Sequence, residues 1–152
     1  MLVHNKLVLA SEMFVEAHER FTLAARNVDF VASLMLSGAV VGIVAPLLKE
    51  QGTGSMHQLL AALSDIVAEP GDAPTHEGMF RAVYNGLKHA GNRNKSVIPS
   101  QDLILHADLR HEAAEMLVAA REDFRKVLVT GDVRNGLPPR FIELITSSAD
   151  YV

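Results

Sequence analysis

The sequence predicts an all-α fold, an antiparallel bundle of four to five main helices with a short C-terminal helix, in one domain over residues 1–152. Hydrophobic residues make up 49% of the chain but aromatic residues only 5%, so Leu, Val, Ile, Met and Ala must fill the core. That mixture suits interlocking helices. Apolar residues also recur every three or four positions in several segments, and the connections between those segments are short.

The first helix is expected over residues 7–27, where the apolar positions are Phe14, Ala17, Phe21, Ala24 and Val28. The second is expected from Asp29, a suitable N-cap, to residue 51, followed by Gly52. Its positions 30–48 are nineteen residues without a formal charge, with Gly38 and Gly42 at GxxxG spacing. A membrane span fits that length, but Pro46 and the small residues favour a buried helix in close contact with a neighbour. We therefore expect no membrane partner.

A third helix is expected over residues 56–68, with an apolar face to be buried: Leu59, Leu60, Leu63, Ile66 and Val67. A fourth should begin after Thr75 and bury a second set: Met79, Phe80, Val83, Leu87 and Ala90. The conformation of residues 100–107 stays open between an extended piece and a first helical turn. The fifth helix, residues 108–130, has a continuous apolar stripe: Leu109, Ala113, Met116, Leu117, Ala120, Phe124, Val127 and Leu128. Pro138 and Pro139 then open a short helix over residues 140–147 that docks Phe141, Leu144 and Ile145.

A basic segment is the most informative feature for function. Residues 78–101 contain no Asp or Glu but contain Arg81, Lys88, Arg93 and Lys95, in a chain of net charge −4. On a helical wheel Arg81, Asn85, Lys88 and Asn92 fall together on the face away from the core, with His89 near its edge. Cations, amides and one imidazole suit a phosphate or a nucleotide. The alternative interpretation is an ordinary solvated helix face.

Other chemistries lack support in the sequence. The chain has no Cys, which excludes disulfides and thiolate sites and is compatible with the cytoplasm, where we expect the protein. His111 and Glu115, one helical turn apart, are two ligands, and two do not make a metal site. There is no GxSxG, Walker loop or GxGxxG. We therefore expect no metal and no cofactor.

Three stretches carry a family resemblance: SLMLSGAVVGIVAPLLKEQG, YNGLKHAGNRNK and IPSQDLILHADLRHEAAEMLVAAREDF. They resemble uncharacterised bacterial helical proteins with a "KHA" motif, here Lys88, His89 and Ala90, which in turn resemble distant members of the HEPN superfamily. The resemblance implies a helical bundle, often a homodimer, that binds RNA or nucleotides and in many members is a ribonuclease. The catalytic signature of that superfamily is Arg, four to six residues, then His.

This chain departs from that signature, because seven residues separate Arg81 from His89. On a continuous helix they would lie about 12 Å apart along the axis, too far to converge on one phosphate. The sequence therefore favours an RNA- or nucleotide-binding HEPN-like domain, with His89 as the candidate catalytic residue if it is a metal-independent ribonuclease. The candidate binding residues are Arg81, Asn85, Lys88, Asn92, Arg93 and Lys95. The alternative is a noncatalytic dimerising interaction module, antitoxin-like or regulatory.

Overall fold

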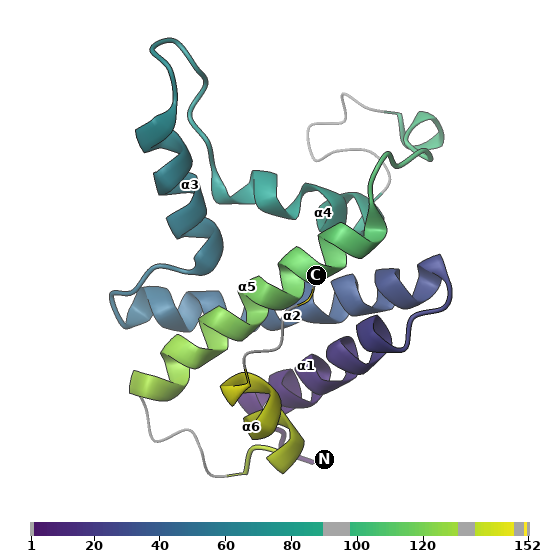
Figure 1. Cartoon of the computed structure of the whole chain (residues 1–152), viewed down its shortest axis with the longest axis vertical. Helices are drawn as coiled ribbons and strands as arrows, with labels where there is room; N and C mark the ends of the chain where they lie inside the picture. The colour runs from purple at the N-terminus through teal and green to yellow at the C-terminus, as the bar shows by residue number, and fades with distance from the viewer. Residues whose placement is uncertain (1, 90–97, 131–135, 148–150, 152) are drawn as a thin grey trace.

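The structure, a computed structural model, describes residues 2–89, 98–130, 136–147 and 151, and its regular elements there are all helical. This confirms the predicted all-α bundle with its short C-terminal helix. The elements, shown in Figure 1, are α1 (Lys6–Thr22), α2 (Asn27–Glu50), α3 (Met56–Val67), α4 (Ala82–Lys88), α5 (Leu109–Thr130) and α6 (Pro139–Thr146), with 3-10 turns η1 (Glu77–Arg81) and η2 (Pro99–Gln101).

Helices α1, α2, α5 and α6 form what we call the body. The central helix α2 packs against both α1 and α5, and α6 packs on α1 and α5. Three fully buried aromatic rings join the layers: Phe141 of α6 lies edge-on to Phe14 of α1 at 5.8 Å and to Phe124 of α5 at 4.6 Å. The predicted docking of α6 through Phe141, Leu144 and Ile145 is thus confirmed.

The sequence placed the α1–α2 junction too late. Helix α1 ends at Thr22 and α2 begins at Asn27, so Asp29 lies inside the first turn of α2. From there its carboxylate accepts hydrogen bonds from the backbone N–H groups of Ala25 and Arg26, at 3.2 and 3.0 Å. An acidic side chain in the first turn also interacts favourably with the helix dipole. Asp29 therefore caps α2 from within.

By length and composition alone α2 would be able to cross a membrane. In the structure it is the most central helix, with an extensive buried side that includes Leu34, Val40, Val44 and Leu48. Pro46 lies within its last turns without ending it. The expectation that the protein has no membrane partner remains a prediction.

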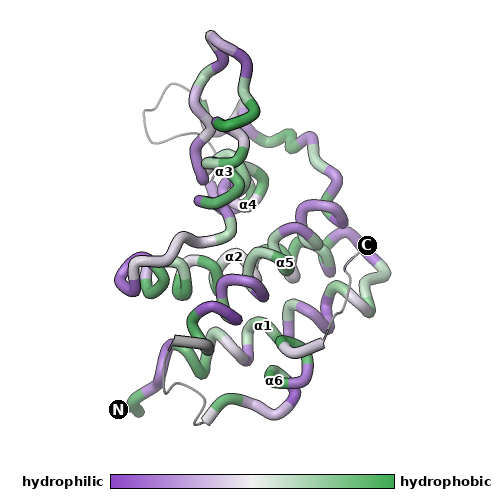
Figure 2. Tube along the Cα trace, turned by 60° about the vertical axis from the view of Figure 1, so that its left-hand side comes forward, coloured by the Kyte–Doolittle hydropathy of each residue, from purple (hydrophilic) through white to green (hydrophobic). Residues whose placement is uncertain are grey.

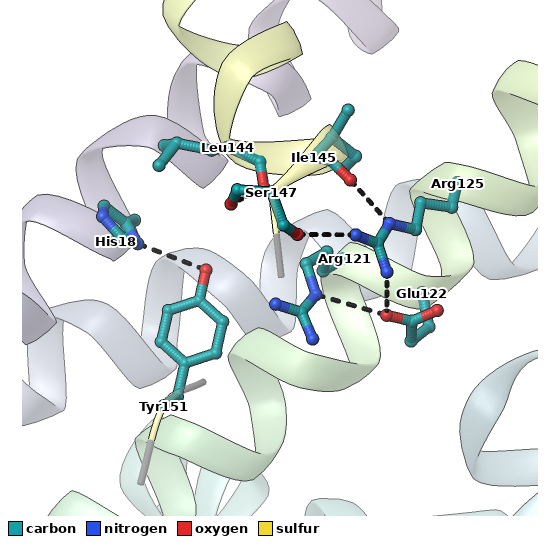
Figure 3. A network of polar contacts seen from close by, with 8 residues as sticks. All are labelled: His18, Arg121, Glu122, Arg125, Leu144, Ile145, Ser147 and Tyr151. Atoms are coloured by element: carbon teal, nitrogen blue, oxygen red, sulfur yellow. Dashed lines mark hydrogen bonds and ion pairs between the residues drawn. The ribbon is translucent and has the colours of Figure 1, made fainter. Parts of the chain in front are cut away.

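Arg125 of α5 ties the C-terminal end of α6 to the body (Figure 3). Its guanidinium donates to the carbonyls of Ile145 and Ser147, and it also pairs with Glu122 at 2.8 Å. Carbonyls at the end of a helix have no partner within the helix, so these bonds satisfy groups that would otherwise lose hydrogen bonds to water.

Tyr151 is also drawn into the body, beside α1 (Figure 3). Its hydroxyl lies 3.2 Å from Nδ1 of His18, and its ring lies under the guanidinium of Arg121, 5.4 Å from the ring centroid. Burial lowers the pKa of His18, which keeps that imidazole neutral in the near-neutral range. The polar groups of the body are thus largely paired.

Residues 56–80, which we call the arm, project from the body, as Figures 1 and 2 show. Helix α3 turns His57 and Ala61 inward, leaving His57 only 4% exposed. The face predicted to be buried points outward instead, and Ile66 and Val67 are 78% and 80% exposed. Leu59 and Leu63 are exposed as well. The prediction of a buried apolar face on this helix was therefore wrong.

Polar anchors at the start of α3 explain its orientation. The Met56 N–H donates to the buried Asp123 carboxylate of α5 at 2.6 Å, and Lys126 donates to the Gly54 carbonyl at 3.0 Å. Ser55 and Gln58 complete a capping box. These contacts fix which side of α3 faces α5, and a hydropathy pattern carries no information about them.

The segment left open by the sequence is neither a strand nor a helical turn over residues 102–107. After η2 the chain runs irregularly with Leu103 and Ile104 exposed, until Asp108 caps α5. The Asp108 carboxylate accepts the N–H groups of Arg110 and His111, both at 3.1 Å. Helix α5 then follows the predicted range and buries the predicted stripe, apart from the half-buried Leu109.

Candidate anion-binding site

The basic helix is shorter than the sequence suggests. The segment after Thr75 forms the 3-10 turn η1 and then α4, which ends at Lys88. His89 has extended backbone angles, φ −140° and ψ 135°, so it is not on the helix with Arg81 and the wheel placed it wrongly. Asn92, Arg93 and Lys95 lie outside the described residues.

Tyr84 anchors α4 to the body. It is the buried residue of this helix, and its ring lies directly over Gly38 of α2, where a Cβ would overlap the ring atoms Cδ2 and Cε2. Only glycine leaves room for so close an approach. The sequence predicted close helix contact at the small residues of α2, and Gly38 confirms it. Met79, predicted to be buried, is instead exposed.

Two cations lie against the Tyr84 ring. Arg81 Cζ is 5.1 Å and Lys88 Nζ is 4.9 Å from the ring centroid, from three residues before and four residues after the tyrosine. Each such contact stabilises by about 0.5–1 kcal/mol at a partly exposed site. The Tyr84 ring therefore contacts both a guanidinium and an ammonium, one from each side along the chain.

Neither cation has an acidic partner in the part of the chain that the structure describes. Arg81 is half-buried rather than on a solvated face, because its guanidinium lies against α2, with Nη2 3.9 Å from where a Cβ on Gly42 would be. Its Nε is buried and makes no hydrogen bond. A half-buried guanidinium without a counter-charge is costly, so this site favours a bound anion.

Lys88 also borders a hollow of about 280 Å³ between the end of α4 and residues 102–105. His89, Gly86 and Leu87 contribute to the same lining. Arg81 does not line this hollow. Lys88 therefore shares the Tyr84 ring with Arg81 and shares the hollow with His89. The structure does not bring Arg81 and His89 into one hollow. Asn85 is exposed on α4.

Sequence reasoning missed Tyr84, which organises the site. The signal was present in the spacing, because residues three before and four after a helical aromatic lie on its own face. Arg81, Tyr84 and Lys88 have that spacing. Hydropathy alone did not reveal it, since tyrosine contributes little to a count of apolar positions.

Two buried titratable groups, His57 of α3 and Asp123 of α5, lie where α3 meets the body, and His57 stacks on Phe80, the residue before Arg81. Burial, and to a lesser extent Arg81, lowers the pKa of His57 to about 4. Burial raises the pKa of Asp123 to about 6, against the opposing effect of the Met56 N–H. His57 Nδ1 and Asp123 Oδ2 have no hydrogen-bond partner. Among the described residues no three His, Asp or Glu side chains gather as metal ligands.

No protein-family model matches this chain, and neither curated protein sequences nor solved structures give a significant match. The geometry of the site is therefore what bears on function.

Proposed function

We propose that this protein binds RNA or a nucleotide through phosphate contacts made by Arg81 and Lys88. The observation that carries the proposal is the pair of cations held against Tyr84 with no carboxylate partner in the described residues. A phosphate oxygen would supply the missing counter-charge and accept from the guanidinium. The HEPN-like resemblance of the sequence points in the same direction.

Tyr84 limits how such a ligand is recognised. Proteins that bind single strands often stack bases on exposed aromatic rings. Tyr84 is only 6% exposed, so its ring faces α2 and the two cations rather than a base. We therefore expect contacts to the phosphates, with little discrimination between base sequences. Exposed Asn85 on α4 would add to these contacts, and Asn92, Arg93 and Lys95 stay binding residues predicted from the sequence alone.

Cleavage of a bound RNA would need a general acid or base beside the phosphate. His89 would be the general acid or base of a metal-independent ribonuclease. Among the residues that the structure describes, the cation that stabilises the cleaved phosphate would then be Lys88, which borders the same hollow, rather than Arg81. We accordingly rank binding ahead of catalysis.

Fluorescence anisotropy with a labelled single-stranded RNA tests the proposal. Lys88→Gln should weaken binding and make the slope of log K against log salt shallower by about 0.7, one phosphate contact to a single strand. Lys6→Gln, which removes an exposed charge at the start of α1, is the matched control and should leave the slope unchanged. Equal effects of both variants would show only nonspecific attraction, and binding by none of the proteins would reject the proposal.

The same samples test cleavage. RNA incubated with EDTA should be cut by the wild type and left intact by His89→Ala if His89 acts without a metal. Binding without cutting by either protein would assign the site to recognition alone.

A second candidate function is a noncatalytic homodimerising module, and the exposed apolar face of α3 favours it. Soluble monomers rarely expose a contiguous apolar helix face. Light scattering coupled to size exclusion should then give a dimer mass without RNA, and His89→Ala should not alter it. A monomer at every concentration tested would reject this function. Either function would be exercised in the cytoplasm.

A further inference from the structure

One cavity, at the junction of the arm with the body, is used by neither proposed function. It has a volume of about 310 Å³ and is lined by residues of α3, η1 and α5. Sites for small molecules usually measure about 300–1,000 Å³. This cavity lies at the small end of that range, so it fits a small molecule rather than a peptide.

Most of the cavity wall is apolar. Apolar side chains from all three elements contribute to it, among them Met56, Leu60, Phe80 and Val118. The Phe80 ring lies parallel to the His57 imidazole, with 8° between the ring planes and 6.0 Å between the centroids. A wall of this kind binds an apolar ring of a ligand, because the contact removes apolar surface from water.

His57 adds an unsatisfied polar group to this wall. The residue lines the cavity and is only 4% exposed, and its Nδ1 has no hydrogen-bond partner. Buried side-chain nitrogens almost always have one. Because the pKa of His57 is lowered to about 4, the imidazole is neutral near pH 7 and does not repel a cation. A ligand with an N–H donor would supply a partner.

Two carboxylates give the cavity a negative charge. Half-buried Glu112 and exposed Glu115 both line it, and they lie three residues apart on one face of α5. Neither has an ion pair or side-chain hydrogen bond within the described part of the chain. Arg81 is near enough to contribute to the low pKa of His57, but it does not line the cavity. No described Lys or Arg does so.

An acidic hollow at the α1–α2 junction shows the contrast. There Glu16 pairs with Arg20 at 2.7 Å, and Asp29 pairs with Arg26 at 3.3 Å. The cations of the chain itself thus neutralise two carboxylates of that hollow. The cavity under α3 combines apolar walls with carboxylates that lack such a counter-charge.

We propose that the cavity between α3, η1 and α5 binds a small organic ammonium ion, with its apolar ring against Leu60 and Phe80 and its ammonium group toward Glu112 and Glu115. The site is complementary to a cation with an apolar body, and its carboxylates would repel a phosphate. An ammonium group has three N–H donors, so it can bond a carboxylate and still supply a partner for an imidazole. The site is therefore distinct from the phosphate contacts proposed for Arg81 and Lys88.

A titration of the ¹⁵N-labelled full chain with benzylamine, followed by amide chemical shifts, tests the location. Residues that line the cavity, such as His57, Phe80 and Ala119, should shift along one saturable curve. Shifts confined to the α1–α2 junction would place the amine in the other acidic hollow and overturn the proposal. So would the absence of saturable shifts up to about 20 mM, the dissociation constant of so small a ligand at the lowest usual efficiency.

Ligand analogues test the chemical class in the same titration. Benzyl alcohol, which has the ring without the charge, should bind at least fivefold more weakly than benzylamine. Methylammonium, which has the charge without the ring, should also bind at least fivefold more weakly. Benzoate should not bind. Equal binding of benzylamine and benzyl alcohol would show a purely apolar cavity and overturn the assignment of an ammonium ligand.

Variants of the carboxylates test their role. Glu112→Gln should raise the dissociation constant of benzylamine about threefold, the effect of one partly exposed ion pair, and Glu115→Gln should act in the same direction. Glu12→Gln removes an exposed carboxylate of α1 and is the matched control, which should leave binding unchanged. The amide spectrum of each variant shows whether it folds. Unchanged affinity in both cavity variants would remove the carboxylates from the site and reject the proposal.

Discussion

The body and the arm are built by opposite rules, although both are helical and both are rich in Leu, Ile and Val. In the body the large apolar side chains are inside, and polar groups such as Arg125 and Tyr151 have partners. In the arm the apolar ridge is outside, and the small inward face rests on His57 and Ala61. The difference shows that an apolar pattern specifies a surface to be covered, without specifying that the same chain covers it.

The basic segment shares the character of the arm. Arg81 and Lys88 are cations without a carboxylate partner in the described chain. In the same way, the outward face of α3 is an apolar surface that nothing in the described chain covers. Unpaired charges and exposed apolar faces persist in folded proteins where a binding partner covers them. We therefore expect the body to determine the stability of the protein, and the arm and the basic segment to determine what it binds.

The largest expected effect separates the body from the arm directly. Phe124→Ala removes a fully buried ring between α5 and α6 and should cost about 3–5 kcal/mol of unfolding free energy. Leu63→Ala in the exposed ridge should change it by no more than about 0.5 kcal/mol. Urea denaturation at a protein concentration below dimer formation measures both. Similar losses of unfolding free energy for the two variants would mean that the outward face of α3 is covered within the monomer.

The next effect concerns the boundary between the two regions, where Asp123 and His57 lie. Their contributions to stability depend on pH in opposite directions. The folded pKa of Asp123 is raised to about 6, so its contribution to stability is lost as pH rises from about 4 to about 6. The folded pKa of His57 is lowered to about 4, so its contribution is lost as pH falls from about 6.5 to about 4. The two slopes largely cancel in the wild type.

Single substitutions should expose each slope. Asp123→Asn should make stability rise with pH between about 4 and 6 relative to the wild type, by on the order of 2 kcal/mol. His57→Gln should make it fall over the same range by a similar amount. Urea midpoints at half-unit pH steps measure both. Parallel curves for all three proteins would show that neither group has a shifted pKa.

The last effect, comparable in size to the preceding one, concerns the junction of α4 with the body. Gly38→Ala introduces a Cβ that overlaps the Tyr84 ring, so the ring must move, at a cost of about 1–3 kcal/mol. Because Tyr84 holds Arg81 and Lys88, RNA affinity should fall together with stability. Gly42→Ala on the same helix, where a Cβ is 3.9 Å from Arg81, is the matched control and should be milder in both measurements. Loss of stability with unchanged binding would separate Tyr84 from the site.

The sequence predicted the helices whose packing lies within the body. Helices α5 and α6 have nearly the predicted ranges, because long apolar stripes and the Pro138–Pro139 pair are strong local signals. Helix α3 had the right range but the wrong orientation, because buried Asp123 and Lys126 orient it from 67 and more residues away in the chain. No local pattern contains that contact.

The candidate site was predicted in composition but not in geometry. Arg81 and Lys88 do contact a common group, but that group is Tyr84, which a search for charged residues passes over. The wheel also assumed one continuous helix, whereas the chain passes from a 3-10 turn into α4 and leaves it before His89. A change of helical pitch shifts every angle after it, so the predicted face could not hold together.

The two bonds at the start of α3 make the arm a lever. The pivot lies at Gly54 and Met56, where Lys126 and Asp123 hold the backbone, while the tip at Ile66 and Val67 is exposed. The helix is about 18 Å long, so a rotation of only 10° about the pivot would carry the tip about 3 Å. His57 of α3 stacks on Phe80 with the ring centroids 6.0 Å apart, so such a rotation would carry η1 together with α3 toward a partner.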